Sequence, residues 1–296
     1  MISSNKNATT QTGIVDSHVH VFDDSKRYPL QVASAYRPPF SPLSSVLDTA
    51  GAAGVDRLVL VQPTPYGDDL SLLTASLAQL GDRGRGVGVA KASVSDAELV
   101  RMRDAGIVAL RFVGMKQADG ADLPGCVPLD ALCRDLAPRL RAFGMHAQLW
   151  APLPDVLALW PQLERTGIPI VLDHMGGFDP ASGRAHKDFQ TLLCLLREGA
   201  VWLKLALCRR VSGLDYTSLR PFHDDLIEAN SERLLWASDF PFVRYPGIQP
   251  TMSGLLGQFR QWVTDKEVAD RILIHNPARL YQFDAPSNNN DTGDQE

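Results

Sequence analysis

Several features that mark specialised classes of protein are missing from this chain of 296 residues. No apolar run approaches the ~20 residues that a membrane helix needs, and the polar N-terminal stretch lacks the apolar segment of a signal peptide. The four cysteines show no CxxC spacing, which argues against a zinc ribbon and against a disulfide framework. We therefore expect a cytoplasmic protein with no membrane partner.

Positive charge is also scarce. The chain has 29 Lys and Arg against 34 Asp and Glu, a formal net charge of −5, and no basic stripe interleaved with aromatic residues. This balance argues against nucleic acid as a partner. A hydrophobic content of 45% and a charged content of 21% are those of an ordinary globular protein with a sizeable core.

Short, continuously hydrophobic runs recur along the chain, as expected for strands buried on both faces. Eight such runs cover residues 13–22, 57–62, 86–91, 107–113, 146–151, 169–174, 201–207 and 234–239. Helical periodicity is found over 41–53, 68–80, 95–105, 129–143, 153–166, 186–198 and 216–229, and again over 264–274. This alternation predicts an α/β fold, a (β/α)8 TIM barrel. No Gly-x-Gly-x-x-Gly turn follows the first run, which disfavours a dinucleotide-binding sheet.

We expect a single barrel domain over residues 13–284. Residues 1–12 form a polar N-terminal extension, and residues 285–296 (APSNNNDTGDQE) are polar enough to predict a disordered tail. Nothing in the composition of the intervening chain indicates a further domain boundary.

Chemically active side chains stand where three of the predicted strands end. His18 and His20 share one face of the first strand, because side chains alternate with period two. His174 ends the sixth strand and Asp239 ends the eighth. The C-terminal ends of barrel strands form one mouth, so we expect these four side chains to meet there.

Four motifs together give the chain a family resemblance. They are the His-x-His pair, LDH at residues 172–174, WASDFP at 236–241 and HNPARLY at 275–281. With these motifs, residues 13–283 resemble the amidohydrolase superfamily. More narrowly, they resemble the amidohydrolase-2 branch that includes 2-pyrone-4,6-dicarboxylate lactonase, sulfomuconolactone hydrolase and sugar-acid lactonases.

The resemblance implies roles for individual residues. Asp239 matches the aspartate that acts as general base towards water, while His18, His20 and His174 would hydrogen-bond the lactone carbonyl. Arg111 and Arg210 match arginines that hold substrate carboxylates, a task suited to the planar guanidinium. Gln62 and Thr64, after the second strand, and Gln148, in the fifth, are expected to complete the substrate-binding surface.

The same comparison bears on metal binding. Arg111 stands where relatives with two metal ions carry a bridging lysine, and Gln148 stands where metal-binding relatives carry a histidine. Since tight metal binding needs three or four well-placed ligands, we expect a site without metal. A single Zn²⁺ held by His18, His20 and Asp239 remains the alternative.

The sequence thus predicts a hydrolase of the carboxylic-ester class, a lactonase that opens a small anionic lactone in the catabolism of aromatic or sugar acids. One alternative is a metal-dependent decarboxylase of the same superfamily, for which only His146 is placed to serve as the additional histidine. The other is a barrel that binds an anionic metabolite without turning it over. The identity of the lactone and the oligomeric state are not predicted.

Overall fold

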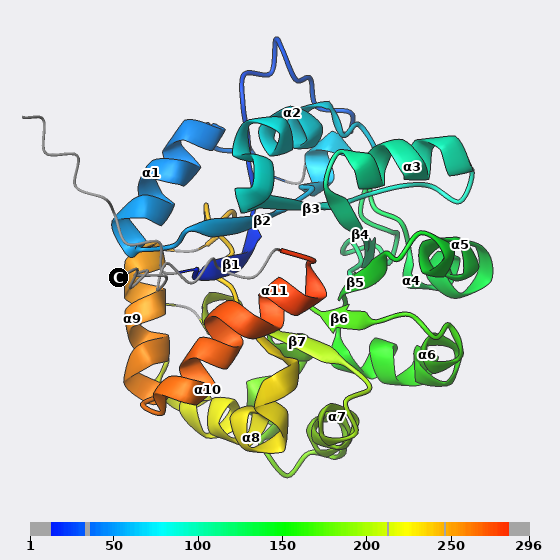
Figure 1. Cartoon of the computed structure of the whole chain (residues 1–296). Coiled ribbons are helices and arrows are strands. Elements are labelled where there is room, and N and C mark those ends of the chain that lie inside the picture. The colour runs from blue at the N-terminus through cyan, green and yellow to red at the C-terminus, as the bar shows by residue number, and fades with distance from the viewer. Residues whose placement is uncertain (1–12, 33–35, 212, 246, 284–296) are drawn as a thin grey trace, which may run out of the picture.

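A parallel barrel forms the centre of the computed structural model, which describes residues 13–283 except 33–35, 212 and 246. Eight strands pair in sequence order and curl into a barrel surrounded by helices (Figure 1). They are β1 (Val15–Val19), β2 (Arg57–Val61), β3 (Gly84–Gly88), β4 (Ile107–Val113), β5 (His146–Trp150), β6 (Ile170–Leu172), β7 (Trp202–Leu205) and β8 (Leu234–Trp236). The predicted (β/α)8 barrel is confirmed.

The first and last strands are joined just beyond their C-terminal ends. Val19 bridges Phe240 in parallel, and the backbone N–H of His20 donates to the carbonyl oxygen of Phe240 at 2.8 Å. The barrel closes next to the His-x-His pair, which fixes the position of that pair relative to the loop after β8.

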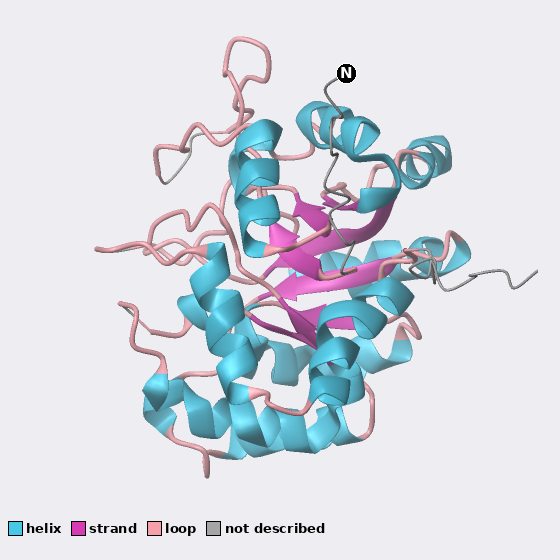
Figure 2. Ribbon diagram, turned by 60° about the vertical axis from the view of Figure 1, so that its left-hand side comes forward, coloured by secondary structure: helices cyan, strands magenta, loops and turns pink. Residues whose placement is uncertain are grey.

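The helices form the outer layer (Figure 2). Their bounds are α1 (Leu43–Ala53), α2 (Ser71–Leu80), α3 (Asp96–Asp104), α4 (Leu129–Ala131), α5 (Ala137–Ala142), α6 (Leu153–Arg165), α7 (Lys187–Arg197), α8 (Arg220–Asn230), α9 (Met252–Trp262), α10 (Lys266–Asp270) and α11 (Asn276–Leu280). A π-helical segment, Leu132–Leu136, joins α4 to α5, and another, Arg271–His275, joins α10 to α11.

One helix was not predicted from the sequence. The expectation of a helix only at 264–274 after the last strand was wrong, because α9 precedes it and packs against α1. Gly254 and Gly257 lie inside α9 and lower its intrinsic helix propensity. The helix nevertheless buries Leu255, Leu256 and Phe259.

The C-terminal segment seals the N-terminal end of the barrel. Leu280, Tyr281 and Phe283 pack in one cluster with inward-facing valines of the strands, and α11 lies across the end of the barrel in Figure 1. The Nδ2 of Asn276 donates to the carbonyl oxygens of Ser231 and Leu234, both at 2.8 Å. The HNPARLY motif therefore has a structural role at the end of the barrel opposite His20 and Asp239.

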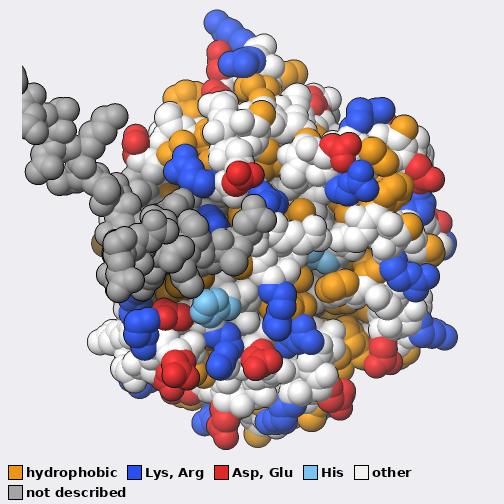
Figure 3. Space-filling model, in the orientation of Figure 1, with side chains coloured by type: hydrophobic (Ala, Val, Ile, Leu, Met, Phe, Trp, Pro, Cys, Tyr) orange, Lys and Arg blue, Asp and Glu red, His pale blue; other side chains and the backbone are white. Residues whose placement is uncertain are grey.

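None of the described helices is long and apolar enough to cross a bilayer. On the face seen in Figure 3, outside the grey atoms, basic and acidic side chains are interspersed and form no basic stripe. The predicted N-terminal extension at 1–12 and disordered tail at 285–296 lie outside the described residues.

Candidate active site

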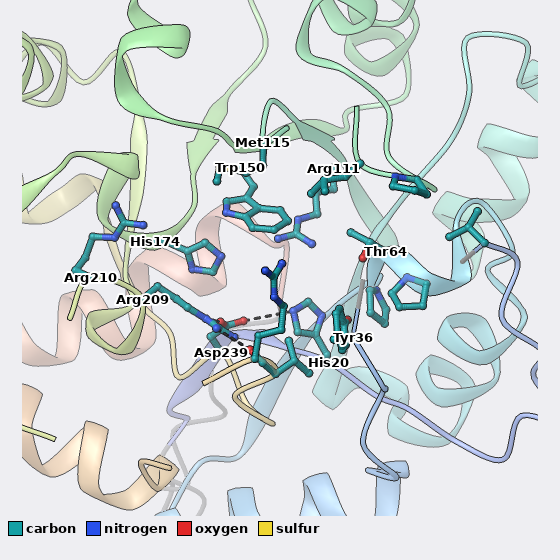
Figure 4. A pocket seen from close by; sticks show the side chains of 17 residues that line it. His20, Tyr36, Thr64, Arg111, Met115, Trp150, His174, Arg209, Arg210 and Asp239 are labelled. Atoms are coloured by element: carbon teal, nitrogen blue, oxygen red, sulfur yellow. Dashed lines mark hydrogen bonds and ion pairs between the residues drawn. The ribbon is translucent and has the colours of Figure 1, made fainter. Parts of the chain in front are cut away.

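A cavity of about 330 Å³ lies beyond the C-terminal ends of the strands (Figure 4). Trp150, Met115 and Val243 supply apolar surface to its wall. Six of the residues predicted from the sequence line it: His20, Thr64, Arg111, His174, Arg210 and Asp239. The strands β4 and β5 and the loops after β1, β2, β6, β7 and β8 therefore contribute to one mouth, as the barrel geometry requires.

Asp239 lies at the floor of this cavity, in a left-handed conformation with φ of 61°. Its Oδ2 accepts from Nε of Arg209, while its Oδ1 lies 3.3 Å from Nε2 of His20 and 3.5 Å from Nε2 of His18. Burial alone would raise the pKa of Asp239, but the positive charge of the adjacent Arg209 guanidinium holds that pKa well below its usual value. Asp239 is therefore a carboxylate at neutral pH.

The contacts of His20 assign one of its protons. Nδ1 of His20 lies 2.7 Å from the carbonyl oxygen of Val61. Because a carbonyl only accepts, Nδ1 carries the proton, and a neutral His20 presents the lone pair of Nε2 towards Asp239. Nε2 of His18 lies 3.3 Å from Nε2 of His20, so the two imidazoles and the carboxylate converge on one point.

His174 lines the cavity from the loop after β6 and has no hydrogen-bond partner for its buried Nδ1 among the described residues. Its backbone is left-handed, with φ of 50°. Burial lowers the pKa of His174 to about 4, so the ring is neutral at pH 7 and carries one N–H. A neutral ring with a free nitrogen can donate to, or accept from, a bound molecule.

Beneath the cavity, Asp173 is the centre of a buried polar network. It accepts from Nε2 of Gln148 at 3.0 Å, from Nη2 of Arg111 at 3.4 Å and lies 3.2 Å from Nδ1 of His18. Lys204 of β7 lies 3.4 Å from the same carboxylate and donates to Oε1 of Gln148 at 2.6 Å. Burial lowers the pKa of Lys204 to about 8, so it is mainly a cation at pH 7.

Three predicted site residues do not line the cavity. His18 is fully buried beneath it and lies next to the lining residues His20, His174 and Asp239. Gln148 is likewise buried, with its amide bonded to Asp173 and Lys204. The Nε2 of Gln62 donates to two backbone carbonyl oxygens of the following loop, those of Gly67 at 3.1 Å and Asp69 at 2.7 Å. The structure thus places Gln62 as a support of that loop.

The buried ion pairs of Arg209, Asp173 and Lys204 were not predicted from the sequence. Of the adjacent arginines, Arg209 reaches Asp239, whereas Nη1 of Arg210 donates to the carbonyl oxygen of Phe178 at 2.6 Å. The sequence did contain signals for two of these residues: Lys204 lies inside an apolar strand, and Asp173 directly precedes His174. Buried charges of this kind are costly unless paired, so each implied a partner.

Three buried side chains are close enough together to hold a metal ion. Ligand atoms of His18, His174 and Asp239 lie within 4.8 Å of one another, and the buried Oδ1 of Asp239 has no hydrogen-bond partner among the described residues. These three residues fit a single divalent ion by number and type. Two cations oppose that fit, because Arg209 pairs with Asp239 and Nζ of Lys204 lies 3.3 Å from Nδ1 of His18. The sequence alternative named His20 as the third ligand, whereas His174 takes that place here.

Comparisons with known proteins identify the family of this chain. The family model described as amidohydrolase matches residues 15–283. The chain is 30% identical to a 2-pyrone-4,6-dicarboxylate hydrolase of Comamonas testosteroni, over 91% of this chain and 90% of that protein. It is 32% identical to a 4-sulfomuconolactone hydrolase of Rhizobium radiobacter, over 91% and 90% of the two chains.

Among solved structures, one described as a 2-pyrone-4,6-dicarboxylic acid hydrolase of Pseudomonas putida superposes with a TM-score of 0.80 at 27% identity. The match covers 93% of this chain and 99% of that one. The chain therefore belongs to the amidohydrolase-2 family.

Proposed function

We propose that this protein is a lactonase: it opens a small anionic lactone ring with a water molecule activated by Asp239. Two lines of support converge. The relatives at 30% and 32% identity are named as hydrolases of 2-pyrone-4,6-dicarboxylate and 4-sulfomuconolactone, both anionic lactones. The cavity combines a buried carboxylate with arginine side chains, which suits hydrolysis of a substrate of negative charge.

Arg111 and Arg210 are proposed to hold anionic groups of the substrate. Arg111 lies over the ring of Trp150, 5.0 Å from its centroid, which keeps the guanidinium at the wall of the cavity. The buried Nε atoms of Arg111 and Arg210 have no hydrogen-bond partner among the described residues. Both guanidinium groups can therefore donate to a carboxylate or sulfonate oxygen without giving up an existing partner.

Asp239 and His174 are proposed to carry the chemical step. Asp239 takes a proton from water as the water oxygen attacks the lactone carbonyl carbon, which forms a tetrahedral oxyanion. The N–H of neutral His174 stabilises that oxyanion, a contribution worth roughly 3–4 kcal/mol for a well-placed donor. The ring C–O bond then breaks, and Asp239 returns the proton to the leaving oxygen. The rings of His18 and His20 lie 3.5 and 3.3 Å from Oδ1 of Asp239 and limit the movement of its carboxylate.

The reaction is proposed to need no metal ion, because Arg209 and Lys204 already place positive charge beside Asp239 and His18. If a divalent ion were bound, His18, His174 and Asp239 would hold it, and it would supply Lewis-acid polarisation and a more acidic water. The decarboxylase alternative receives little support. His146, its candidate for an additional histidine, lies away from the cavity with its ring 5.2 Å from that of Tyr281.

The observation that carries the proposal is the ionised Asp239 on the floor of an arginine-lined cavity. We expect Asp239→Asn to lower kcat by at least ~10³-fold, since an amide cannot accept the proton, on 2-pyrone-4,6-dicarboxylate or 4-sulfomuconolactone. Binding of the lactone, measured by calorimetry, should persist. The exposed Asp48→Asn serves as the matched control. Turnover that survives in Asp239→Asn would refute the role of this residue as base, and binding without turnover in the unaltered protein would favour the non-catalytic barrel.

A further inference from the structure

Four arginines line the cavity, and one of them differs from the rest. Arg209 pairs with Asp239, Arg111 with Asp173, and Arg210 donates to a backbone carbonyl oxygen. Arg244, in the loop after β8, is exposed, and its guanidinium donates to no group in the part of the chain that the structure describes. This positive charge at the mouth of the cavity therefore has no internal partner there.

The backbone of this loop holds Arg244 in an unusual conformation. Its φ is 60°, in the left-handed region that disfavours a residue with a side chain, and Phe242 has φ of 59°. The conformation is held from both sides. Nη1 of Arg209 donates to the carbonyl oxygen of Val243 at 2.8 Å, and the backbone N–H of Tyr245 donates to the carbonyl oxygen of Phe242 at 3.0 Å. Backbone strain of this kind clusters at functional sites, and here it occurs in a loop that lines the cavity.

Positively charged side chains outnumber negatively charged ones in the lining of the cavity. Among the described residues that line it, Asp239 is the only acid, and it neutralises Arg209. Arg111 is already paired with Asp173, so Arg210 and Arg244 are the lining arginines with no acidic partner at ion-pair distance among the described residues. A lactone with a single carboxylate would meet Arg210 and leave Arg244 without a counterion. A lactone with two anionic groups would supply a partner to Arg244 as well, and a guanidinium is suited to grip a carboxylate or sulfonate with two hydrogen bonds.

We infer that Arg244 is a specificity-determining residue that binds a second anionic group of the substrate, so that the site selects dianionic lactones over monoanionic lactones of the same ring. The inference rests on the proposed lactonase function. The two ends of the cavity then have different roles. Asp239 and His174 act on the ester at the floor, and Arg244 binds an anionic group of the substrate at the mouth.

The test uses a matched pair of lactones. 4-Sulfomuconolactone carries a carboxylate and a sulfonate, and muconolactone has the same ring with the carboxylate alone. We expect Arg244→Gln to raise KM for 4-sulfomuconolactone by ~10- to 100-fold, the loss typical of a charged hydrogen bond. The rise in KM for muconolactone should stay below ~3-fold, the size expected of a change in screened charge alone.

Two further variants distinguish a direct contact between Arg244 and the substrate from a general effect of positive charge near the cavity. Arg244→Lys keeps the charge without the two-pronged geometry and should recover part of the lost affinity. Arg37→Gln removes one exposed positive charge beside the cavity residue Tyr36 without touching the cavity lining. It should alter KM for both lactones equally and weakly. Equal effects of Arg244→Gln on the two lactones, or no effect on either, would overturn the inference.

Failure of the lactonase proposal is distinguishable from failure of this inference. If the unaltered protein hydrolyses neither lactone, the lactonase proposal fails, and calorimetric Kd values for the same pair still test Arg244. Preferential loss of 4-sulfomuconolactone binding in Arg244→Gln would support the inference. Equal binding of the two lactones by the unaltered protein, or binding of neither, would contradict it.

Discussion

The backbone N–H of Asp239 donates a hydrogen bond of 2.9 Å to the carbonyl oxygen of His18. This bond crosses the seam where the barrel closes, and it is reinforced by Asp16, whose Oδ1 accepts from the backbone N–H of Ser238 at 3.0 Å. The candidate base and the His-x-His pair are therefore held together by the same hydrogen bonds that close the barrel. The geometry of the site is a property of the whole fold.

Arg209 controls the proton affinity of Asp239. Its guanidinium favours the carboxylate form, so Arg209→Gln should raise the pKa of Asp239. A base is active only when deprotonated, and the acid limb of the kcat/KM profile should move to higher pH by about 1–3 units. Arg210→Gln is the matched control, because Arg210 does not contact Asp239. It should raise KM and leave the acid limb in place; an equal shift in both variants would contradict the assignment.

Removal of metal tests the proposal of metal-free chemistry. We expect protein treated with a strong chelator and passed over a desalting column to retain its full kcat on an anionic lactone, with metal content measured by mass spectrometry. Added Zn²⁺ should leave the rate unchanged or lower it, because the ion would compete for Asp239, His18 and His174. Activity that disappears on chelation and returns with Zn²⁺ would make these three residues metal ligands and reopen the decarboxylase alternative.

Lys204 supports the site from beneath without lining the cavity. Lys204→Met should lower the free energy of unfolding by about 3–5 kcal/mol, since it leaves Oε1 of Gln148 and part of the Asp173 charge without a partner in a buried site. The kcat should fall more than KM changes, because the substrate surface is intact while His18 loses its support.

A double variant checks this coupling. If Lys204 acts through Gln148, then Lys204→Met combined with Gln148→Leu should cost less stability than the sum of the two single changes, as measured by denaturant unfolding. Additive losses would show that the two side chains act independently.

A histidine far from the site should make stability depend on pH. His223 of α8 is buried against the rings of Phe259 and Trp262, and burial lowers its pKa to about 4 from 6.5. The folded state disfavours protonation, so the stability that His223 contributes is complete above pH 6.5 and is lost as pH falls towards 4.

The corresponding variant is His223→Leu. Between about pH 7.5 and about pH 5, the unaltered protein should lose about 2 kcal/mol more unfolding free energy than His223→Leu, at 1.36 kcal/mol per unit of pKa shift. Chemical denaturation at the two pH values measures the difference. His275→Gln removes an exposed histidine. This control variant should show the same dependence of unfolding free energy on pH as the unaltered protein. A His223→Leu variant with the same pH dependence as the unaltered protein would contradict the assignment.

The fold could be predicted because its signals are local. Buried parallel strands are apolar on both faces, and glycines such as Gly54 follow the helices in the left-handed conformation that ends them. α9 was not predicted, because the two glycines inside it weaken its helical signal in the sequence. The helix forms because its apolar face packs against the rest of the fold. The loop conformations of His174 and Asp239, both left-handed, also lay beyond local signals, because sequence patterns for such φ values favour glycine.

By itself, the sequence determined the alternation of strands and helices, and hence that His20, His174 and Asp239 share one mouth. Tertiary structure alone decided which charges are paired. It placed Arg209 on Asp239, buried Gln148 and Lys204 around Asp173, and left Arg244 without a partner among the described residues. The physical reason is range: strand and helix formation depends on neighbours along the chain, whereas the pairing of buried charges depends on distances set only when the barrel closes.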